Sequence, residues 1–460
     1  MTRVTADPTI LSIPEIRSTF RGQVIGPEDE GYDAARAVMM GGVEGRPAVI
    51  VRVADATDVA RVIQLARETG LELAVRSGGH SAAGHGVNDG GIVLDLRDMK
   101  GIDLDVEGRT VWAETGLTAG ELSVATAAHG LAIGFGDTGS VGIGGITLGG
   151  GVGYLVRKHG LTIDNLLAAE IVTADGTLLR VDAESHPDLF WAIRGGGGNF
   201  GVATRFQYRL HLVDTVYGGM LLLPASAASV AAFMAAAETA PEELSAIANV
   251  MPAPPLPFLP EEHHGTLSIF ALMVFAGDPA AGEQAMQPFR DIAAPLADML
   301  KPMPYPEIYP PEDPDYHPTA AARTMFIDHV DRATAETIIG HLQASDATMR
   351  VAQLRTLGGA LARVPADATA YAHRSSRIMV NVAAFYDGEE DRSAKEAWVA
   401  DFCHALDQGD PAAYVNFVGD EGAARVRAAY PGATWERLVA VKRQYDPGNL
   451  FRLNQNVPPD

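Results

Sequence analysis

The sequence has little of what marks a secreted, membrane-bound or disulfide-stabilised protein. Its 460 residues include a single cysteine, Cys403, so no disulfide can form within the chain. Its longest apolar run, near residues 267–276, is too short to span a bilayer, and its N-terminus lacks the apolar core of a secretory signal. These absences favour a cytoplasmic protein.

Basic residues are also scarce. Lysine and arginine number 35 against 58 aspartates and glutamates, which leaves a formal net charge of −23. Nucleic acids and anionic membrane surfaces attract basic patches, so we expect neither as a partner. The sequence has no P-loop lysine pattern and no zinc-ligand spacing, and the pair His263 and His264 lies in a proline-flanked, solvated loop. We therefore predict no metal site.

The first part of the chain has a strand–helix–strand pattern. Residues 48–53 and 71–75 have the apolar runs of buried strands, and residues 57–69 have the spacing of an amphipathic helix. The second strand is followed at once by a glycine-punctuated loop, residues 76–81. Because ligands commonly bind at the C-terminal ends of such strands, this loop is the first candidate for a binding site.

The loop at 76–81 combines groups that suit a phosphate. Its two glycines allow backbone N–H groups to approach an anion closely, and Arg76 and Ser77 would add side-chain donors. Phosphate binding needs no histidine, however. The presence of His80 in the loop therefore indicates a second role.

Two further glycine-rich segments follow, at residues 134–153 and 195–201. The first could close with the loop at 76–81 around one extended ligand, although two ordinary turns would give the same pattern. The second has the dinucleotide-binding spacing G-x-G-x-x-G, which must open a helix. Because residues 202–212 have the pattern of a strand, we expect an ordinary turn there and no dinucleotide site of that kind.

The composition of the sequence changes near residue 214, where the glycine runs end. Up to residue 407, alanine-rich helices alternate with strand-like runs, and the tail from about residue 408 has a pattern of its own. We therefore predict three segments, 1–213, 214–407 and 408–460, in an α+β fold.

Four segments, taken in order, resemble one family of flavoproteins. They are residues 76–96, 142–165, 187–201 and 445–456, and they are similar to the berberine bridge enzyme-like oxidases of the vanillyl-alcohol oxidase superfamily. The resemblance runs from end to end of the chain and is looser in the middle segment. It implies an α+β, two-domain PCMH-type FAD-binding fold. The first segment and the tail would bind FAD, and an antiparallel sheet of the middle segment would roof the flavin.

The resemblance also implies how FAD is held. The family histidine that matches His80 bonds covalently to the methyl carbon on flavin C8. Many relatives have a second link from a cysteine, at the position that Thr138 occupies here, so we expect a single link and a structural role for Cys403. The residues that match cofactor-binding positions are Arg76, Ser77, Gly78, Gly79, His80, Ser81, Gly84, Thr138, Gly139, Val141, Gly142, Gly144, Gly145, Gly149, Gly150, Gly153, Tyr154, Asn165, Ile171, Val172, Asn416, Asn454 and Asn456.

The pair Tyr414 and Asn416 resembles the family segment that carries a catalytic tyrosine over the flavin. A phenolate there could take a proton from a substrate O–H or N–H while hydride leaves carbon for flavin N5. Because an unperturbed tyrosine titrates at about 10, it needs hydrogen-bond donors or a cation nearby. The candidate cations are Arg157, Lys158, His373 and Arg374. A tyrosine that packs at the domain boundary, or an amine oxidation without a protein base, is the alternative.

The middle segment contains the candidates for substrate binding. Gln353 and Arg355 alternate on one face of an expected strand, and Tyr371 and His373 lie near the next; structural roles are their alternatives. The resemblance implies two-electron oxidation of a C–OH or C–N bond of a small molecule, with O2 as oxidant and H2O2 as product, by a monomer or homodimer. A natural-product tailoring enzyme that cyclises, rearranges or oxygenates its substrate, and a non-catalytic flavin-binding protein, are the rival functions.

Overall fold

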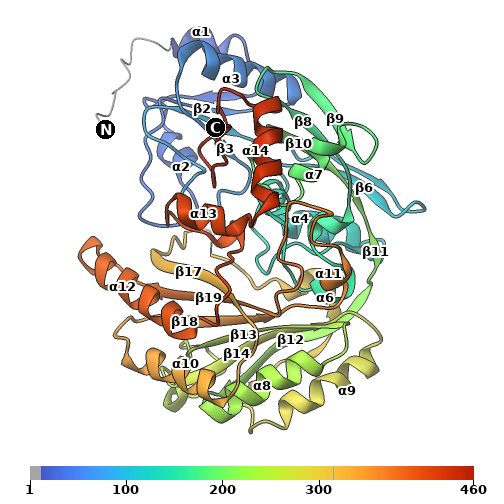
Figure 1. The fold of residues 1–460 in the computed structure, drawn as a ribbon, viewed down its shortest axis with the longest axis vertical. Helices are drawn as coiled ribbons and strands as arrows, with labels where there is room; N and C mark the ends of the chain where they lie inside the picture. The colour runs from blue at the N-terminus through green and yellow to red at the C-terminus, as the bar shows by residue number, and fades with distance from the viewer. Residues whose placement is uncertain (1–11, 314) are drawn as a thin grey trace.

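A computed structural model describes residues 12–313 and 315–460 and shows an α+β fold, as predicted (Figure 1). A first sheet joins its strands in the order β1-β2-β4-β3, with β4 parallel to both β2 and β3. Its strands are β1 (Gln23–Ile25), β2 (Val49–Arg52), β3 (Leu73–Arg76) and β4 (Ile92–Asp95). Helices α1 (Ile13–Arg17) and α2 (Tyr32–Arg36) lie beside it.

Helix α3 (Ala56–Thr69) connects β2 to β3 and confirms the strand–helix–strand prediction. The side chain of Asp55 caps its N-terminus by accepting hydrogen bonds from two backbone N–H groups, and Gly70 ends it in the left-handed conformation, at φ 69°. The helix buries Val59, Val62 and Ile63 against the sheet, at about 1.5–3 kcal/mol for each side chain. This packing fixes the end of β3, from which the loop at 76–81 starts.

A second sheet is antiparallel and has the order β5-β6-β10-β8-β9. Its strands are β5 (Ile102–Asp105), β6 (Thr110–Glu114), β8 (Leu166–Val172), β9 (Leu178–Asp182) and β10 (Val202–Arg209). The strand expected after the glycine run at 195–201 is therefore confirmed as β10, which excludes the helix that a dinucleotide motif of that spacing needs. The turn between β8 and β9 has Gly176 at φ 85°.

Shorter elements lie between the strands of this half. They are α4 (Ala119–Ala127), β7 (Leu131–Ala132), α5 (Ile143–Gly149), α6 (Val156–His159), the 3-10 turn η2 (Thr162–Asn165), α7 (Pro187–Ala192) and β11 (His211–Leu212). Helix α5 was not expected, because it lies in the glycine-rich segment 134–153. Its position brings that segment beside the loop at 76–81.

The middle of the chain forms a large antiparallel sheet, with the order β15-β12-β14-β13-β18-β19-β17 and β16 paired to β12. Its strands are β12 (Thr215–Pro224), β13 (Leu244–Pro252), β14 (Leu267–Phe275), β15 (Ala297–Asp298), β16 (Lys301–Pro304), β17 (Ala320–Ile327), β18 (Arg350–Thr356) and β19 (Ile378–Phe385). The 3-10 turns η3 (Glu261–His263) and η4 (Tyr305–Ile308) and helix α11 (Ala360–Arg363) lie in its connections.

Four helices pack on the large sheet and build its core. They are α8 (Ala227–Thr239), α9 (Pro279–Arg290), α10 (Arg332–Ala344) and α12 (Glu389–Leu406). In Figure 1 they lie on the side of the sheet away from the first half of the chain. Cys403 is buried in this core, as expected for a structural cysteine. The other face of the sheet is left to meet the first half of the chain.

The C-terminal segment returns to the first half of the chain (Figure 1). It contains the 3-10 turn η5 (Val415–Phe417) and helices α13 (Ala423–Ala429) and α14 (Ala433–Tyr445). The fully buried ammonium of Lys442 donates to the carboxylate of Asp446, at 2.7 Å, and to the carbonyl oxygens of Asn199 and Phe451. A buried charge with three acceptors holds this segment against the glycine run at 195–201. Among the helices of the described residues, none has the length and apolarity to cross a bilayer.

Candidate functional site

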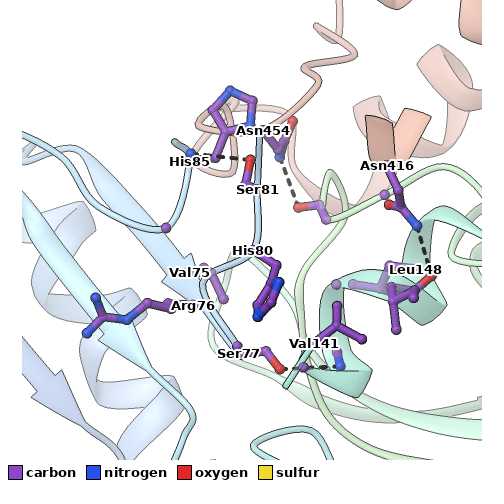
Figure 2. Close-up of a pocket in the computed structure, with 18 of the residues that line it drawn as sticks. Val75, Arg76, Ser77, His80, Ser81, His85, Val141, Leu148, Asn416 and Asn454 are labelled. Atoms are coloured by element: carbon purple, nitrogen blue, oxygen red, sulfur yellow. Dashed lines mark hydrogen bonds between the residues drawn. The ribbon is translucent and has the colours of Figure 1, made fainter. Parts of the chain in front are cut away.

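A cavity of about 390 Å³ lies where the loop at 76–81, helix α5 and the C-terminal segment meet (Figure 2). Its volume is in the usual range for small-molecule sites. Of the predicted site residues, those that line it are Arg76, Ser77, Gly78, Gly79, His80, Ser81, Thr138, Val141, Gly142, Gly144, Gly145, Tyr414, Asn416 and Asn454. Three stretches that are far apart in the sequence therefore converge on one space.

The loop at 76–81 presents backbone donors to this space. Within the described residues, the N–H groups of Gly79, His80 and Ser81 make no hydrogen bond, and Gly79 has a φ of 75°, which favours glycine. Successive free N–H groups in such a turn form an anion-binding concavity. The predicted phosphate-binding character of the loop thus rests on its backbone.

The side chains of Arg76 and Ser77 do not add the donors that we predicted. The guanidinium of Arg76 is fully buried and donates to the carboxylate of Asp95, at 2.7 Å, and to the carbonyl oxygen of Ala35. Figure 2 shows this side chain directed away from His80. The hydroxyl of Ser77 donates to the carbonyl oxygen of Thr115, at 2.5 Å. Arg76 therefore joins β3 to its neighbours, and the prediction of a phosphate-facing arginine is wrong.

Two glycines leave room in the cavity that any side chain would fill. A Cβ at Gly145 or Gly198 would meet no atom within 4 Å, and both residues line the cavity. At Gly142, by contrast, a Cβ would lie 2.2 Å from the nitrogen of Gly78. The first pair therefore keeps space open for a ligand, whereas Gly142 allows the two loops to pack against each other.

His80 lies near the end of this loop, and its ring contacts the segment before α5. Its Nε2 is 2.9 Å from the hydroxyl of Ser140, which in turn donates to the carboxylate of Glu312. Burial lowers the pKa of His80 below its usual value of 6.5, although Glu312 and Asp137 oppose the shift. The imidazole of His80 is therefore neutral at pH 7.

Tyr414 also lines the cavity and accepts two hydrogen bonds at its hydroxyl. The donors are the N–H of Gly151 and the side-chain amide of Asn416, both at 2.9 Å. Burial is the largest influence and raises the pKa of Tyr414 above its usual value of 10, while these two donors and, more weakly, the cation Arg355 oppose the rise. Two donors and one cation are the arrangement that stabilises a phenolate.

The cation near Tyr414 is Arg355, which is not one of the four candidates predicted from the sequence. The four are committed elsewhere: Arg374 pairs with Asp164, Arg157 and Lys158 donate to backbone carbonyls of the large sheet and its helices, and His373 is 2.9 Å from the carbonyl oxygen of Ala429. The expected cation is therefore present, but it comes from β18.

The predicted substrate residues divide into two groups. Arg355 pairs with the cavity-lining carboxylate of Asp137, at 2.5 Å, and Gln353 accepts from Arg355 at 2.7 Å, so both lie next to the cavity. Tyr371 packs edge-on against Tyr414, with ring centres 6.1 Å apart. His373 is buried away from the cavity, and its contacts are structural.

Ten predicted cofactor residues do not line the cavity. Asn165 donates to the carbonyl oxygens of His159 and Leu161, and Ile171 and Val172 pack in β8 against Gly201, so these three support neighbouring segments. The others are Gly84, Gly139, Gly149, Gly150, Gly153, Tyr154 and Asn456. Gly150 lies behind the cavity, where a Cβ would be 3.3 Å from the Tyr414 ring.

Several lining residues were not predicted. The glycine run that we interpreted as an ordinary turn contributes Gly197, Gly198 and Gly201, so the turn borders the ligand space although it opens no helix. His85 also lines the cavity, and burial lowers its pKa to about 4. The repeated glycines at 195–201 were a usable signal for the first group.

Comparisons with known proteins agree with this geometry. Residues 47–182 match the model of the FAD binding domain, and residues 413–458 match that of berberine and berberine-like proteins. The sequence is 31% identical to (R)-6-hydroxynicotine oxidase from Paenarthrobacter nicotinovorans, over 96% of this chain and 98% of that one. The chain therefore belongs to the berberine bridge enzyme-like FAD-linked oxidases.

Solved structures show the same fold. The crystal structure of 6-hydroxy-D-nicotine oxidase from Arthrobacter nicotinovorans has a TM-score of 0.85 at 29% identity and covers 96% of this chain and 99% of its own. Glucooligosaccharide oxidase from Acremonium strictum, with its 6-S-cysteinyl, 8α-N1-histidyl FAD, has a TM-score of 0.84 at 22% identity and covers 98% of this chain and 100% of its own. The second likeness concerns the fold alone.

Proposed function

We propose that this FAD-linked oxidoreductase removes two electrons from a C–OH or C–N bond of a small organic molecule and passes them to O2, which becomes H2O2. When bound, FAD supplies the hydride acceptor, N5, and the reaction with dioxygen. The observation that supports this function best is Tyr414, whose hydroxyl is held by two donors on the wall of the FAD cavity.

The chain offers a consistent set of groups to hold FAD. The free N–H groups of Gly79, His80 and Ser81 suit the pyrophosphate, and Gly145 and Gly198 leave the space that the cofactor needs. We further propose one covalent bond, between His80 and the flavin. No second link is expected, because Thr138 lines the cavity and Cys403 is buried in the core of the large sheet.

Tyr414 would act as the proton acceptor. The N–H of Gly151 and the amide of Asn416 point at the oxygen that carries the negative charge after proton loss, and Arg355 adds a positive charge nearby. A substrate O–H or N–H that approaches this oxygen can give up its proton as hydride leaves the neighbouring carbon. The aromatic ring of Tyr371 supports Tyr414 from the side.

The polar end of the cavity would orient the substrate. Asp137 reaches the cavity, and Arg355 and Gln353 stand behind it. A substrate with one hydrogen-bonding group beside the oxidised carbon fits this arrangement, and the relative that oxidises (R)-6-hydroxynicotine is in keeping with a small C–N compound. The fungal FAD-linked oxidoreductases pgmH and fogF match 45% and 88% of this chain, and neither name states a tailoring reaction.

The test is substrate-dependent bleaching of the flavin without oxygen, followed by peroxide release when oxygen returns. A panel of small secondary alcohols, amines and hydroxylated N-heterocycles covers the proposed class. We expect a member of this class to bleach the flavin and to yield one H2O2 for each substrate consumed. If no member bleaches the flavin, a flavin-binding protein is favoured. If the reduced flavin is not reoxidised by oxygen, a dehydrogenase is favoured.

A further inference from the structure

A carboxylate from the middle of the chain reaches the loop that contains His80. Glu312 follows η4 and precedes β17, in a connection of the large sheet, yet it accepts hydrogen bonds from both the backbone N–H of Ser140, at 3.1 Å, and the Ser140 hydroxyl. The Ser140 hydroxyl is also 2.9 Å from Nε2 of His80. Three side chains from two parts of the fold thus form one hydrogen-bonded chain that ends at the histidine.

The number of protons in this chain decides its direction. A carboxylate accepts hydrogen bonds and has none to donate, and a serine hydroxyl has a single proton. Because the hydroxyl of Ser140 donates to Glu312, its oxygen can only accept from His80. Nε2 of His80 must therefore carry a proton.

The opposite ring nitrogen is then the reactive one. Burial keeps the imidazole of His80 neutral at pH 7, and a neutral imidazole has one proton. With that proton on Nε2, Nδ1 has a free lone pair, and no described residue donates a hydrogen bond to it. A neutral ring nitrogen with a free lone pair is a nucleophile.

We propose that Glu312, acting through Ser140, is a positioning residue that holds the His80 proton on Nε2 and leaves Nδ1 to bond the flavin methyl carbon. This inference rests on the covalent bond of the proposed function. In that step an N–C bond forms between Nδ1 and the methyl carbon, and a C–H bond of the methyl group breaks. His80 gives up one proton and the methyl group gives up another. These two protons, together with the electron pair released in the step, reduce dioxygen to H2O2, so that atoms and electrons balance.

The connection that contains Glu312 is anchored well enough to hold the chain in place. Tyr305 and Ile308 are buried in a core shared by both halves of the protein. Tyr309 packs against Gly139, the residue before Ser140: a Cβ placed on Gly139 would be only 3.3 Å from the Cβ of Tyr309. The carboxylate is therefore delivered to Ser140 by packed residues on its N-terminal side.

The first test measures the His80 tautomer directly. The full-length chain, labelled with ¹⁵N-histidine and produced without riboflavin, is examined by NMR, with the His80 signals assigned from His80→Ala. We expect the Nε2–H tautomer in the wild type, a mixture in Glu312→Ala and Ser140→Ala, and the wild-type tautomer in Glu312→Gln, because a glutamine oxygen still accepts from Ser140. A wild-type chain with the proton on Nδ1 would overturn the proposal.

The second test follows covalent incorporation after FAD is added to the same flavin-free chains, by intact mass after acid denaturation. We expect Glu312→Ala and Ser140→Ala to incorporate FAD about tenfold more slowly than the wild type, with Glu312→Gln close to it. Glu307→Ala is the matched control, because Glu307 is exposed in the same connection and its side chain has no hydrogen bond among the described residues. Wild-type rates in Glu312→Ala would overturn the role of Glu312 alone, whereas a wild-type chain that binds FAD without bonding it would overturn the covalent part of the proposed function and the role of Nδ1 with it.

Discussion

The two ends of the cavity are built from different parts of the polypeptide. The end at residues 76–81 and 142–145 presents backbone N–H groups, glycines and the ring of His80, while the side chain of Arg76 turns away to Asp95. The end at Tyr414 presents side chains that are paired with one another, including Asp137 with Arg355. A backbone surface suits a cofactor that is the same in every relative, whereas a side-chain surface can be changed to suit a substrate without altering the fold.

The largest effect is expected at the side-chain end. Tyr414→Phe removes the proton acceptor and keeps the ring, so flavin reduction by substrate should slow by about 10²–10⁴-fold while FAD content is unchanged. Anaerobic stopped-flow spectroscopy measures the reduction rate. Unchanged reduction would remove Tyr414 as the base and favour an amine oxidation that needs none.

A smaller effect is expected when the backbone end is filled. Gly145→Leu places a side chain in the cavity, and overpacking of about 1–3 kcal/mol corresponds to roughly 5–150-fold weaker FAD binding. The flavin content of the purified chain and titration with FAD report it. Gly340→Leu is the control, because Gly340 lies on the exposed face of helix α10, where a Cβ meets nothing within 4 Å. Equal FAD affinity in the two variants would contradict the assignment of this space to the cofactor.

The pH profile separates charge from position at the side-chain end. Burial raises the pKa of Tyr414 and Arg355 opposes that rise; because the reaction requires the deprotonated tyrosine, the rate of flavin reduction rises with pH through that pKa. Arg355→Met removes the cation and should shift the rise upward, by on the order of one pH unit. A profile that stays in place would show that Arg355 acts only through its contacts with Asp137 and Gln353.

The smallest effect is expected at the single cysteine. Cys403→Ala removes a small buried group from the core of the large sheet, so the free energy of unfolding should fall by about 1 kcal/mol. Covalent flavin should be unchanged, as measured by denaturant titration and intact mass on the same sample. Lost flavin attachment would mean that the large sheet affects the backbone end more than its contacts indicate.

The backbone end was largely predictable from the sequence, because glycines and the strand before them leave a local pattern. His80 and the loop around it were placed correctly at the end of β3. Helix α5 was not predicted, because glycines disfavour an isolated helix. In the folded chain, packing against the loop at 76–81 stabilises it. The exposed strand β5, with the pattern Ile-Asp-Leu-Asp, was missed for lack of an apolar run.

The side-chain end was less predictable, because its pairs join residues far apart in the sequence. Arg355 was nominated for substrate and is the cation beside Tyr414, while the cations nominated for that role pair elsewhere. No local pattern marks Glu312, which reaches Ser140 only in the folded chain. The orientation of Arg76 was not predicted, for the same reason: its partner Asp95 lies on the neighbouring strand β4.

The most direct test of the account is the intact mass of the purified, acid-denatured protein, with peptide mapping around His80. The account predicts a chain heavier by one FAD, with the added mass on the peptide that contains His80 and none on the peptide that contains Cys403. A chain without added mass, although FAD is released into the supernatant, would contradict the covalent link and leave the cavity as a site for dissociable flavin.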